Sequence, residues 1–364
     1  MRPDTSVTRT NPYNILARPL LKWAGLHLRD LPWKQSDDPY HIWLSEIILQ
    51  QTQVAQGIPY YRKFADRYPT VHELAAASED QVLKDWQGLG YNTRARNLHA
   101  AAKHISQSLN GAFPRTYEGL LTLPGVGPYT AAAIASFAYD LPVPVIDTNV
   151  LRVMSRFLGL SDPVGSRALH RAVEDALTPL MSKVSPSTFN QAIMDFGALQ
   201  CTPASPQCGD CPLARDCVAY QGGLVETLPV RKRKQPRRHR WFHYLVLYND
   251  HGVLMRQRTR RDIWHRMYDF PLVECSQQTP EAEVVRDLLI TLTGSGAHPE
   301  PSISTDQQVL THQHIHCIFY AYSWAELDVE ALPEGYRFVE FQKLNNFAVP
   351  KIIDCYFRSN SILL

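Results

Sequence analysis

The sequence predicts two domains of different fold class, an all-α domain followed by an α+β domain. Apolar residues recur at helical spacing over residues 39–220, and strand-like alternation first appears after that stretch. Between the two halves, the ten residues 231–240 include seven Lys or Arg and no acid. We therefore place a helical domain at 1–228, a basic linker at 229–240 and an α+β domain at 241–364.

Composition narrows the classes of protein that fit. The chain has 364 residues, of which 45% are hydrophobic, so each domain has enough apolar material for a core and disorder is not expected. There is no run of about 18 apolar residues, so no membrane span is expected. The first 30 residues are interrupted by charges and lack the apolar stretch of a secretory signal. We therefore expect a cytoplasmic protein.

The first helices follow from apolar spacing. The run from Ile42 to Val54 predicts a helix, which we expect to end at Gly57 and Pro59. Residues 71–86 and 94–108 repeat the pattern and predict two more helices.

A helical hairpin is predicted over residues 120–139, with a Pro-Gly-Val-Gly-Pro turn at 124–128. Gly125 and Gly127 allow a tight turn, and the backbone N–H groups at the start of the second helix can bind an anion such as a DNA phosphate. The alternative is an ordinary helix–helix turn capped by glycine.

Four of the seven cysteines lie within 17 residues, separated by six, two and five residues. Such thiols can surround one small metal centre. Zinc sites usually pair two Cys-x2-Cys knuckles, whereas iron–sulfur clusters accept uneven spacing. Zinc and four unrelated buried thiols remain alternatives. The candidate ligands are Cys201, Cys208, Cys211 and Cys217.

Two carboxylates are candidates for acid–base work. Glu46 lies among apolar residues, which would raise its pKa and suit a general acid, although it could also be an ordinary polar-face residue. Asp147 follows an apolar run and could equally cap the helix that we expect to reach Phe157. Two carboxylates in separate environments are typical of glycosidic bond cleavage.

The second half of the sequence has the pattern of an α+β domain. Residues 241–248 and 252–257 predict two strands around a turn at 249–252. A helix is predicted over 280–293, opened by a proline, and a strand over 314–324.

The hairpin at 123–131, Asp147 and the cysteines at 201–217 stand in an order that resembles the helix-hairpin-helix DNA glycosylases with an iron–sulfur cluster. Residues 43–52 are similar to the W-x-S-E-x-x-L-Q-Q-T motif of the MutY-type adenine glycosylases. Tyr129 stands where thymine-glycol endonucleases carry a lysine that would attack the sugar. The resemblance implies a hydrolytic, monofunctional adenine glycosylase of base excision repair, with a 4Fe–4S cluster on the four cysteines.

Roles for individual residues follow from the same resemblance. Glu46 would protonate N7 of adenine, and Asp147 would stabilise the oxocarbenium ion, with Tyr129 and Asn149 positioning these two groups. The substrate would be double-stranded DNA with adenine opposite 8-oxoguanine or guanine, and the adenine would be flipped out of the helix.

Three further residues are assigned to DNA by the resemblance. Gln51 matches a residue that wedges into the duplex, and Tyr91 matches a tyrosine that stacks beside the lesion base, although Tyr91 could also pack in an ordinary turn. Arg215, between two of the cysteines, is a candidate for binding phosphate.

The second domain resembles the Nudix-like domain of the adenine glycosylases through residues 262–271. Residues 281–294 lack the R-E-x-x-E-E core, so pyrophosphatase activity is not expected. The domain should sense 8-oxoguanine through His312, Gln313 and His314, which replace the Phe-Ser-His loop of many bacterial members. The family's link to replication and mismatch repair implies a sliding clamp or mismatch-repair proteins as partners. The resemblance also implies a monomeric bacterial enzyme that associates with the nucleoid when bound to DNA.

Two other functions compete with this one. A mismatch-thymine glycosylase would share Tyr129 and the cysteines, but the Glu46 motif and the second domain argue against it. A catalytically silent DNA-binding module, such as a redox sensor, would not need both Glu46 and Asp147.

Overall fold

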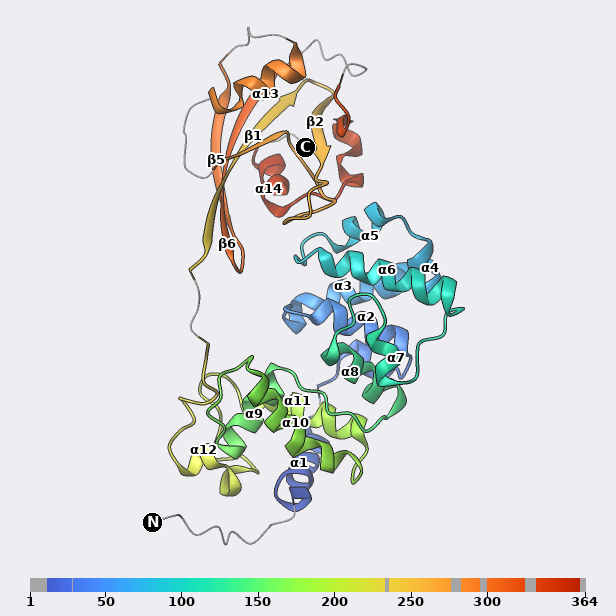
Figure 1. The fold of residues 1–364 in the computed structure, drawn as a ribbon, viewed down its shortest axis with the longest axis vertical. Helices are drawn as coiled ribbons and strands as arrows, with labels where there is room; N and C mark the ends of the chain where they lie inside the picture. The colour runs from blue at the N-terminus through green and yellow to red at the C-terminus, as the bar shows by residue number, and fades with distance from the viewer. Residues whose placement is uncertain are drawn as a thin grey trace. The chain divides into compact units, whose positions relative to one another are not determined.

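The computed structural model describes residues 12–27, 29–232, 236–275, 283–294, 300–324 and 332–360. The chain forms two compact units (Figure 1). The first unit runs to Ala75, resumes at Ala100 and reaches the basic linker. The second combines Ala76–His99 with the chain that follows the linker. Each unit is described by itself.

The first unit is helical, and no strand occurs among the described residues before residue 238, as the sequence predicts. Helix α6 (Thr93–Ser108) begins in the second unit and ends in the first. The other elements of the first unit, in chain order, are η1 (Tyr13–Ala17), α1 (Arg18–His27), η2 (Pro32–Gln35), α2 (Pro39–Leu49), α3 (Val54–Arg67), α4 (Val71–Ala76), α7 (Tyr117–Leu121), α8 (Pro128–Tyr139), α9 (Thr148–Leu158), α10 (Arg167–Met181), α11 (Pro186–Leu199), η3 (Ala214–Asp216) and α12 (Val218–Gln221).

One core of this unit is shared by α1, α9, α10 and α11. The amphipathic helix α9 turns Val150, Val153 and Phe157 toward it. Trp23 of α1 meets the ring of Phe196 edge-on, with ring centroids 5.0 Å apart. This packing fixes α9, the helix that follows the candidate catalytic Asp147.

Helices α2 and α8 are apolar around almost their whole circumference and pack against each other. A helix of that kind is stable only inside a protein. Asp38 caps α2, accepting a hydrogen bond from the Tyr40 N–H at 2.8 Å. Polar side chains on the facing surfaces of α2 and α8 are therefore shielded from solvent: Glu46 is buried and Tyr129 is half-buried.

The predicted end of the first helix was wrong. Helix α2 stops at Leu49, where Gln51 adopts a left-handed backbone with φ of 54°, and α3 then runs through Gly57 and Pro59. Gly57 serves close packing, because a Cβ atom there would lie 2.8 Å from the Leu49 side chain. Pro59 lies in the second turn of α3, so α3 loses one early backbone hydrogen bond and continues.

The apolar run over 71–86 forms two helices, α4 and α5 (Glu79–Trp86), rather than one. Ser78 separates them by accepting a hydrogen bond from the Gln81 N–H at 3.2 Å, which is an N-cap. The predicted helix over 94–108 matches α6, and the predicted hairpin matches α7 and α8.

A mixed sheet forms the centre of the second unit. Its strands run in the order β3-β2-β1-β6-β5, with β4 also paired to β1 and β7 to β2. Strands β1 and β6 are parallel, and the other pairs are antiparallel. The elements are β1 (Arg238–Tyr248), β2 (Gly252–Gln257), β3 (Tyr268–Asp269), β4 (Leu272–Cys275), α13 (Glu283–Thr293), β5 (Ser302–Val309), β6 (Gln313–Ser323), β7 (Tyr336–Glu340), η4 (Phe341–Asn346) and α14 (Lys351–Ser359).

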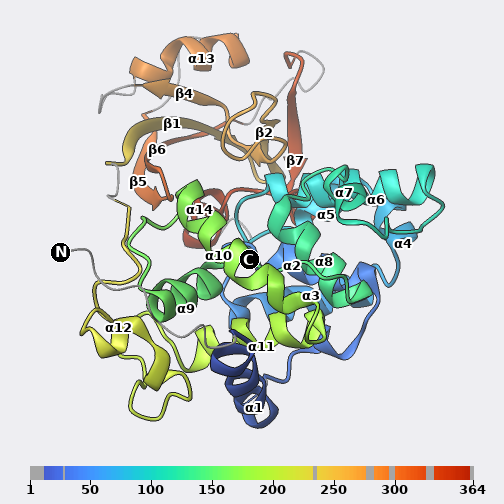
Figure 2. The same cartoon turned by 60° about the horizontal axis from the view of Figure 1, so that its bottom comes forward.

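Both faces of the sheet are covered by helices. Phe242, Tyr244 and Val246 of β1 pack in one core with α14, whereas the alternating Leu245 and Leu247 pack in another with α13. Figure 2 shows α13 beside the sheet. Strands β1, β2 and β6 confirm the predicted strands, and α13 confirms the predicted helix from residue 283 onward, since 280–282 lie outside the described residues.

The basic linker is described in part, because residues 233–235 lie outside the described ranges. Arg231, Lys232 and Arg238 are exposed. Strand β1 begins at Arg238, so the last residues assigned to the linker are strand. Arg240 is buried and pairs with Asp262 and Glu274.

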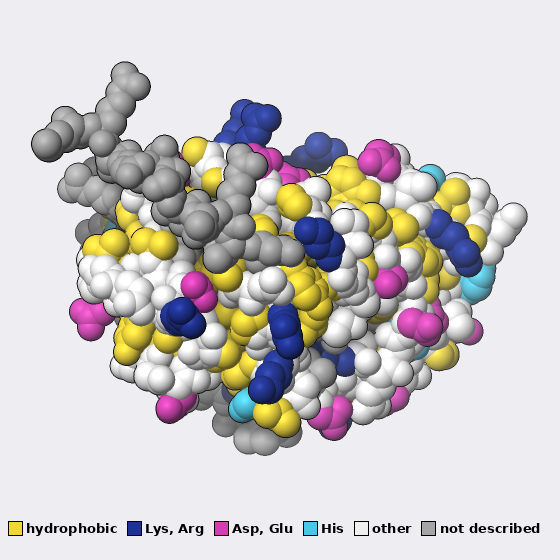
Figure 3. All heavy atoms as spheres, turned by 90° about the horizontal axis from the view of Figure 1, so that it is seen from below, with side chains coloured by type: hydrophobic (Ala, Val, Ile, Leu, Met, Phe, Trp, Pro, Cys, Tyr) yellow, Lys and Arg dark blue, Asp and Glu magenta, His cyan; other side chains and the backbone are white. Residues whose placement is uncertain are grey.

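Charge is mixed over the surface seen in Figure 3, where several Lys and Arg side chains follow one another across the middle of the view. Within the described parts of the chain, every helix is too short or too polar to cross a membrane.

Candidate active site and cysteine cluster

Glu46 is buried on α2, with 6% of its surface exposed. The hydroxyl of Tyr129, on α8, donates a hydrogen bond of 2.7 Å to its Oε2. Burial raises the pKa of Glu46 to about 7, against the effect of the Tyr129 hydrogen bond, and the negative charge of Asp147 raises it further. Glu46 therefore keeps a proton close to neutral pH, as a general acid requires.

Asp147 is the N-cap of α9 and also lines the cleft that holds Glu46, so the two alternatives considered for it are compatible. Its Oδ1 accepts from the Val150 N–H at 2.7 Å, and its Oδ2 accepts from the Asn149 side-chain amide at 2.6 Å. Burial raises the pKa of Asp147, while these donors and the Arg152 charge lower it. Asp147 thus accepts two hydrogen bonds that favour its ionised form, whereas Glu46 accepts one, so the two carboxyl groups lie in different environments.

The side chain of Asn149 is held in place by Arg152, which also contacts the start of the loop that carries the clustered cysteines. Arg152 donates to the Asn149 Oδ1 at 2.8 Å, to the Gly197 carbonyl at 2.6 Å and to the Cys201 carbonyl at 2.7 Å. A Cβ atom on Gly197 would lie 2.7 Å from the Asn149 Cβ, so this position requires glycine. The orientation of Asn149 toward Asp147 is thus fixed by α9, α11 and the start of the cysteine loop.

One cleft brings these residues together. It is lined by Glu46, Tyr129, Asp147 and Asn149, and also by Gln51, Gly125 and Gly127. Gly125 has φ of 73°, which favours glycine, and open space surrounds the Cα of Gly127, directly before α8. The start of α8 therefore lines the cleft with open space beside Gly127, and a helix N-terminus favours an anion.

Gln51 and Tyr91 share an uncommon backbone. Both are non-glycine residues in the left-handed region, with φ of 54° and 48°, and both side chains are exposed. Such strained positions cluster at functional sites. Tyr91 belongs to the second unit, where its hydroxyl contacts that of Thr311.

The predicted lesion-reading residues lie at the turn between β5 and β6. His312 is exposed, and its carbonyl accepts from the Arg238 N–H at 3.0 Å. The Gln313 side-chain oxygen is engaged by Arg240 at 2.9 Å. The Nε2 of His314 lies 2.9 Å from the Gln307 side-chain oxygen.

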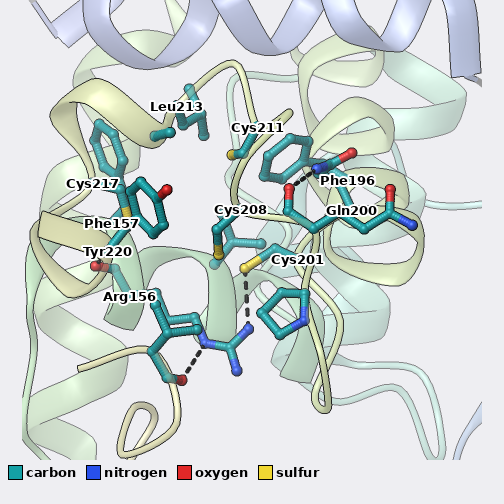
Figure 4. A pocket seen from close by; sticks show the side chains of 15 residues that line it. Arg156, Phe157, Phe196, Gln200, Cys201, Cys208, Cys211, Leu213, Cys217 and Tyr220 are labelled. Carbon is teal, nitrogen blue, oxygen red and sulfur yellow. Dashed lines mark hydrogen bonds between the residues drawn. The ribbon is translucent and has the colours of Figure 1, made fainter. Parts of the chain in front are cut away.

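The four clustered cysteines line a single cavity between α9, α11 and the loop that follows α11 (Figure 4). Arg156 of α9 approaches this cavity, with its Nη1 3.4 Å from the Cys201 sulfur. The same guanidinium donates to the Thr202 carbonyl at 2.7 Å and to the Leu228 carbonyl at 2.9 Å. A buried cation thus stands beside sulfur atoms that would be anionic as metal ligands.

The thiols are costly to ionise without a metal. Burial raises the pKa of Cys211 to about 11, and the pKa values of Cys208 and Cys217 are raised by the same cause. All seven cysteines are free of disulfides. A polynuclear cation in this cavity would stabilise four thiolates at once, so the donor set fits a metal centre. Arg215 is exposed on η3, beside this loop.

Sequence reasoning missed Arg152, Arg156 and Asp195. Asp195 is buried on α11, lines the cleft and pairs with Arg29 at 2.7 Å and Lys34 at 2.6 Å. The two arginines are four residues apart on α9, a spacing that places them on one face. Their partners are mostly backbone carbonyls far along the chain, which a sequence pattern does not reveal.

Comparison with known proteins supports this description. Residues 44–179 match the model of the HhH-GPD superfamily base excision DNA repair protein, and residues 243–358 match that of the NUDIX domain. A thermostable thymine-DNA glycosylase has a similar structure, with a TM-score of 0.54 and 29% identity over 58% of this chain and 97% of that chain. The molecule is therefore a DNA glycosylase of the helix-hairpin-helix superfamily joined to a NUDIX domain.

Proteins with similar sequences identify the enzyme family. The adenine DNA glycosylase of Buchnera aphidicola subsp. Baizongia pistaciae is 37% identical over 67% of this chain and 69% of its own length. Those of Mycobacterium tuberculosis (strain H37Rv) and Rattus norvegicus are 41% and 40% identical, over 58% and 63% of this chain and 69% and 48% of their own lengths. This chain belongs to the adenine DNA glycosylase family, hydrolases of N-glycosidic bonds that act in base excision repair.

Proposed function

We propose that the enzyme hydrolyses the N-glycosidic bond of adenine paired with 8-oxoguanine, or with guanine, in duplex DNA. The observation that carries the proposal is the buried Glu46, whose pKa is raised to about 7, in a cleft that also holds Asp147, whose carboxylate accepts two hydrogen bonds. One carboxyl group can then donate a proton while the other stabilises positive charge.

In the first step, Glu46 donates its proton to N7 of the flipped adenine, which makes the base a better leaving group. The bond between the sugar and the base breaks, and positive charge develops on the sugar. Asp147, held by Asn149 and the Val150 N–H, stabilises that charge. Water then adds to the sugar, with ionised Glu46 as the base that activates it.

Tyr129 supports a monofunctional reaction. Its hydroxyl is engaged as a donor to Glu46, and burial together with the neighbouring carboxylates raises its pKa well above the ordinary value. A neutral phenol is a poor nucleophile toward the sugar, whereas a lysine amine would form a Schiff base and break the strand. The expected product is an abasic site in an intact strand.

We further propose that Cys201, Cys208, Cys211 and Cys217 hold a 4Fe–4S cluster, which the family typically carries. When bound, the cluster supplies a cross-link that fixes the loop after α11, with no electron transfer required for hydrolysis. Iron and sulfide analysis of the purified enzyme tests this. About four of each per chain is expected, and one zinc without sulfide would favour the zinc alternative.

DNA binding would combine several described features. The start of α8 would bind one DNA phosphate, and Arg215 would bind a second. Gln51, which is exposed at the cleft, would act as the wedge. Extruding adenine costs a few kcal/mol and least at a mispair, so these contacts have to offset only a modest penalty. In the second unit, Tyr91, His312, Gln313 and His314 would recognise the 8-oxoguanine side. Contacts with a sliding clamp or mismatch-repair proteins stay predictions.

A single-turnover base-release assay tests the proposal. The substrates are duplexes with adenine opposite 8-oxoguanine or guanine, and controls with adenine opposite thymine and thymine opposite guanine. Each sample is divided, and one half is heated in alkali. Breaks only in the two adenine mispairs, and only after alkali, are expected. Cleavage of the thymine–guanine duplex would instead identify a thymine glycosylase, and breaks without alkali would contradict the role of Tyr129.

A further inference from the structure

We propose that His239, His314 and His316 bind a divalent ion of a late first-row transition metal, zinc foremost, on the sheet of the second unit. Imidazole nitrogens are favoured ligands of such ions, and three of them with an open fourth position for water form a common zinc environment. The proposal does not rest on the glycosylase reaction, although His314 is also one of the residues proposed above to recognise 8-oxoguanine.

Strand register places the three rings together. In the parallel pair of β1 and β6, His239 lies directly opposite His314, and Trp241 lies opposite His316. Side chains two residues apart on a strand share a face, so all three histidines emerge on the same side of the sheet. One ring nitrogen of each lies within 4.8 Å of the others. Small rotations of exposed or half-buried rings are enough to bring them around one ion.

The hydrogen bonds within the cluster leave lone pairs available. Nδ1 of His239 and Nε2 of His316 are 2.9 Å apart, and only one of the two can hold the hydrogen between them. The other nitrogen therefore carries a lone pair at the position where a metal would replace that hydrogen. Nε2 of His314 lies 2.9 Å from the side-chain oxygen of Gln307, which only accepts, so Nε2 carries the hydrogen and the lone pair of this ring is on Nδ1.

The surroundings hold one of the three rings in a fixed orientation. Trp241 stacks on His316 with ring centroids 5.0 Å apart, which limits rotation of that ligand. Arg238 and Arg240 flank His239 along β1 and therefore lie on the opposite face, where Arg240 forms ion pairs with Asp262 and Glu274.

Zinc titration of the iron-loaded enzyme tests the site. The wild-type protein, freed of loose metal by a chelator that leaves its iron content unchanged, is titrated with Zn²⁺ by calorimetry. It is then dialysed and analysed for zinc and iron. One zinc per chain is expected at constant iron. His239→Gln and His316→Gln should each weaken binding at least tenfold. His251→Gln, an exposed histidine in the turn between β1 and β2, is the matched control and should bind as the wild type does.

A second measurement guards against misfolded variants. Zinc bound only to the folded state raises the melting temperature, so zinc should raise it in the wild type and in His251→Gln but not in His316→Gln. Equal zinc binding by wild type, His239→Gln and His316→Gln would overturn the proposal, as would the absence of stoichiometric binding in the wild type. Loss of iron in step with zinc uptake would also overturn it, because zinc would then occupy the cysteines.

Discussion

At the scale of single residues, burial of the Glu46 carboxyl affects both catalysis and folding. The apolar surroundings of α2 and α8 keep the proton on the acid, and the same surroundings penalise the ionised form. The protonated form that the first chemical step requires is therefore also the form that the folded protein accommodates best. Two predictions on this one side chain separate the effects.

Glu46→Gln should bind a duplex with adenine opposite 8-oxoguanine about as tightly as the wild type, yet release no base. Glutamine keeps the volume and still accepts the Tyr129 hydrogen bond, but it has no proton to give. Gel-shift binding together with single-turnover kinetics measures both properties. Wild-type turnover in this variant would refute the acid role.

The same substitution should alter how stability depends on pH. The folded pKa of about 7 lies above the ordinary 4.5, so between these values the folded state holds more protons than the unfolded state. Wild-type stability therefore falls as pH rises through this window and levels off above it. Glu46→Gln avoids this loss, which amounts to at most about 3 kcal/mol for a shift of this size.

The measurement is the difference in melting temperature between Glu46→Gln and the wild type at pH 5 and at pH 8. The melting temperature of Glu46→Gln should rise relative to that of the wild type as the pH is raised from 5 to 8. Glu118→Gln, which removes an exposed glutamate on α7, is the control and should show no such trend. A difference that stays constant with pH would show that Glu46 ionises normally.

Tyr129→Lys should gain strand-nicking activity. The new amine would lie beside Glu46, in the same cleft as Asp147, where it can attack the sugar and form a Schiff base. Borohydride trapping of a covalent protein–DNA adduct measures this gain. Tyr129→Phe offers no nucleophile and is the matched control. Failure to trap any adduct with the lysine variant would mean that position 129 cannot reach the sugar.

The sequence was informative about residues whose partners lie nearby along the chain or are implied by a family motif. The structure gathers Glu46, Tyr129, Asp147 and Asn149 in one cleft, while their roles stay proposals. The sequence could not reveal Arg152, since the carbonyls that this side chain binds belong to residues 197 and 201, which approach α9 only in the folded chain.

At the scale of elements, the breaks between helices carry functional side chains. The sequence located most helices, but it misplaced the end of the first because Gly57 and Pro59 have more than one use. Glycine permits a close approach between helices, and proline is tolerated in an early helical turn. The actual break occurs at Gln51, a residue with no intrinsic preference for ending a helix.

Gln51→Gly should separate backbone strain from side-chain function. Glycine removes the cost of a positive φ, of order 1 kcal/mol, so the melting temperature should stay level or rise. Loss of the wedge should nevertheless weaken binding to the mispaired duplex and slow base release by tenfold or more. Asn110→Gly, at a similar φ of 51° after α6, should change stability alone. If Gln51→Gly binds and reacts normally, Gln51 is not a wedge.

At the scale of the whole molecule, the basic segment between the two halves contains both exposed arginines and one buried, ion-paired arginine. The sequence marked the segment as a block of charge, but it could not show that Arg240 is engaged in ion pairs inside the second unit. The change from helices to strands could be predicted because the spacing of apolar residues and the amino-acid composition both change near the basic segment. The assignment of Ala76–His99 to the second unit could not be predicted from the sequence. It depends on contacts between residues far apart in the chain, such as that between Lys84 and the Phe347 carbonyl.

Replacing Arg231, Lys232 and Arg238 with glutamine should weaken binding to damaged and undamaged duplexes alike. For each DNA phosphate that is no longer neutralised, the slope of log K against log salt should become shallower by about 0.9. Fluorescence anisotropy over a range of salt concentrations measures the slope. Arg358→Gln, an exposed arginine on α14, is the control and should leave it unchanged. An unaltered slope in the triple variant would make the segment a spacer.

The parallel pairing of β1 with β6 also has a consequence for synthesis on the ribosome. About 65 residues separate the end of β1 from the start of β6, so the apolar edge of β1 waits roughly 3 to 13 s for its partner at ordinary translation rates. Strands β2 and β4 are made earlier and pair with β1, so only the edge that faces β6 stays open, and an open apolar edge invites aggregation. We expect the arginines at the start of β1 to act as gatekeepers during this interval, because like charges discourage the nascent chains on one polysome from pairing with each other. The charged segment would then protect the enzyme before any DNA is bound.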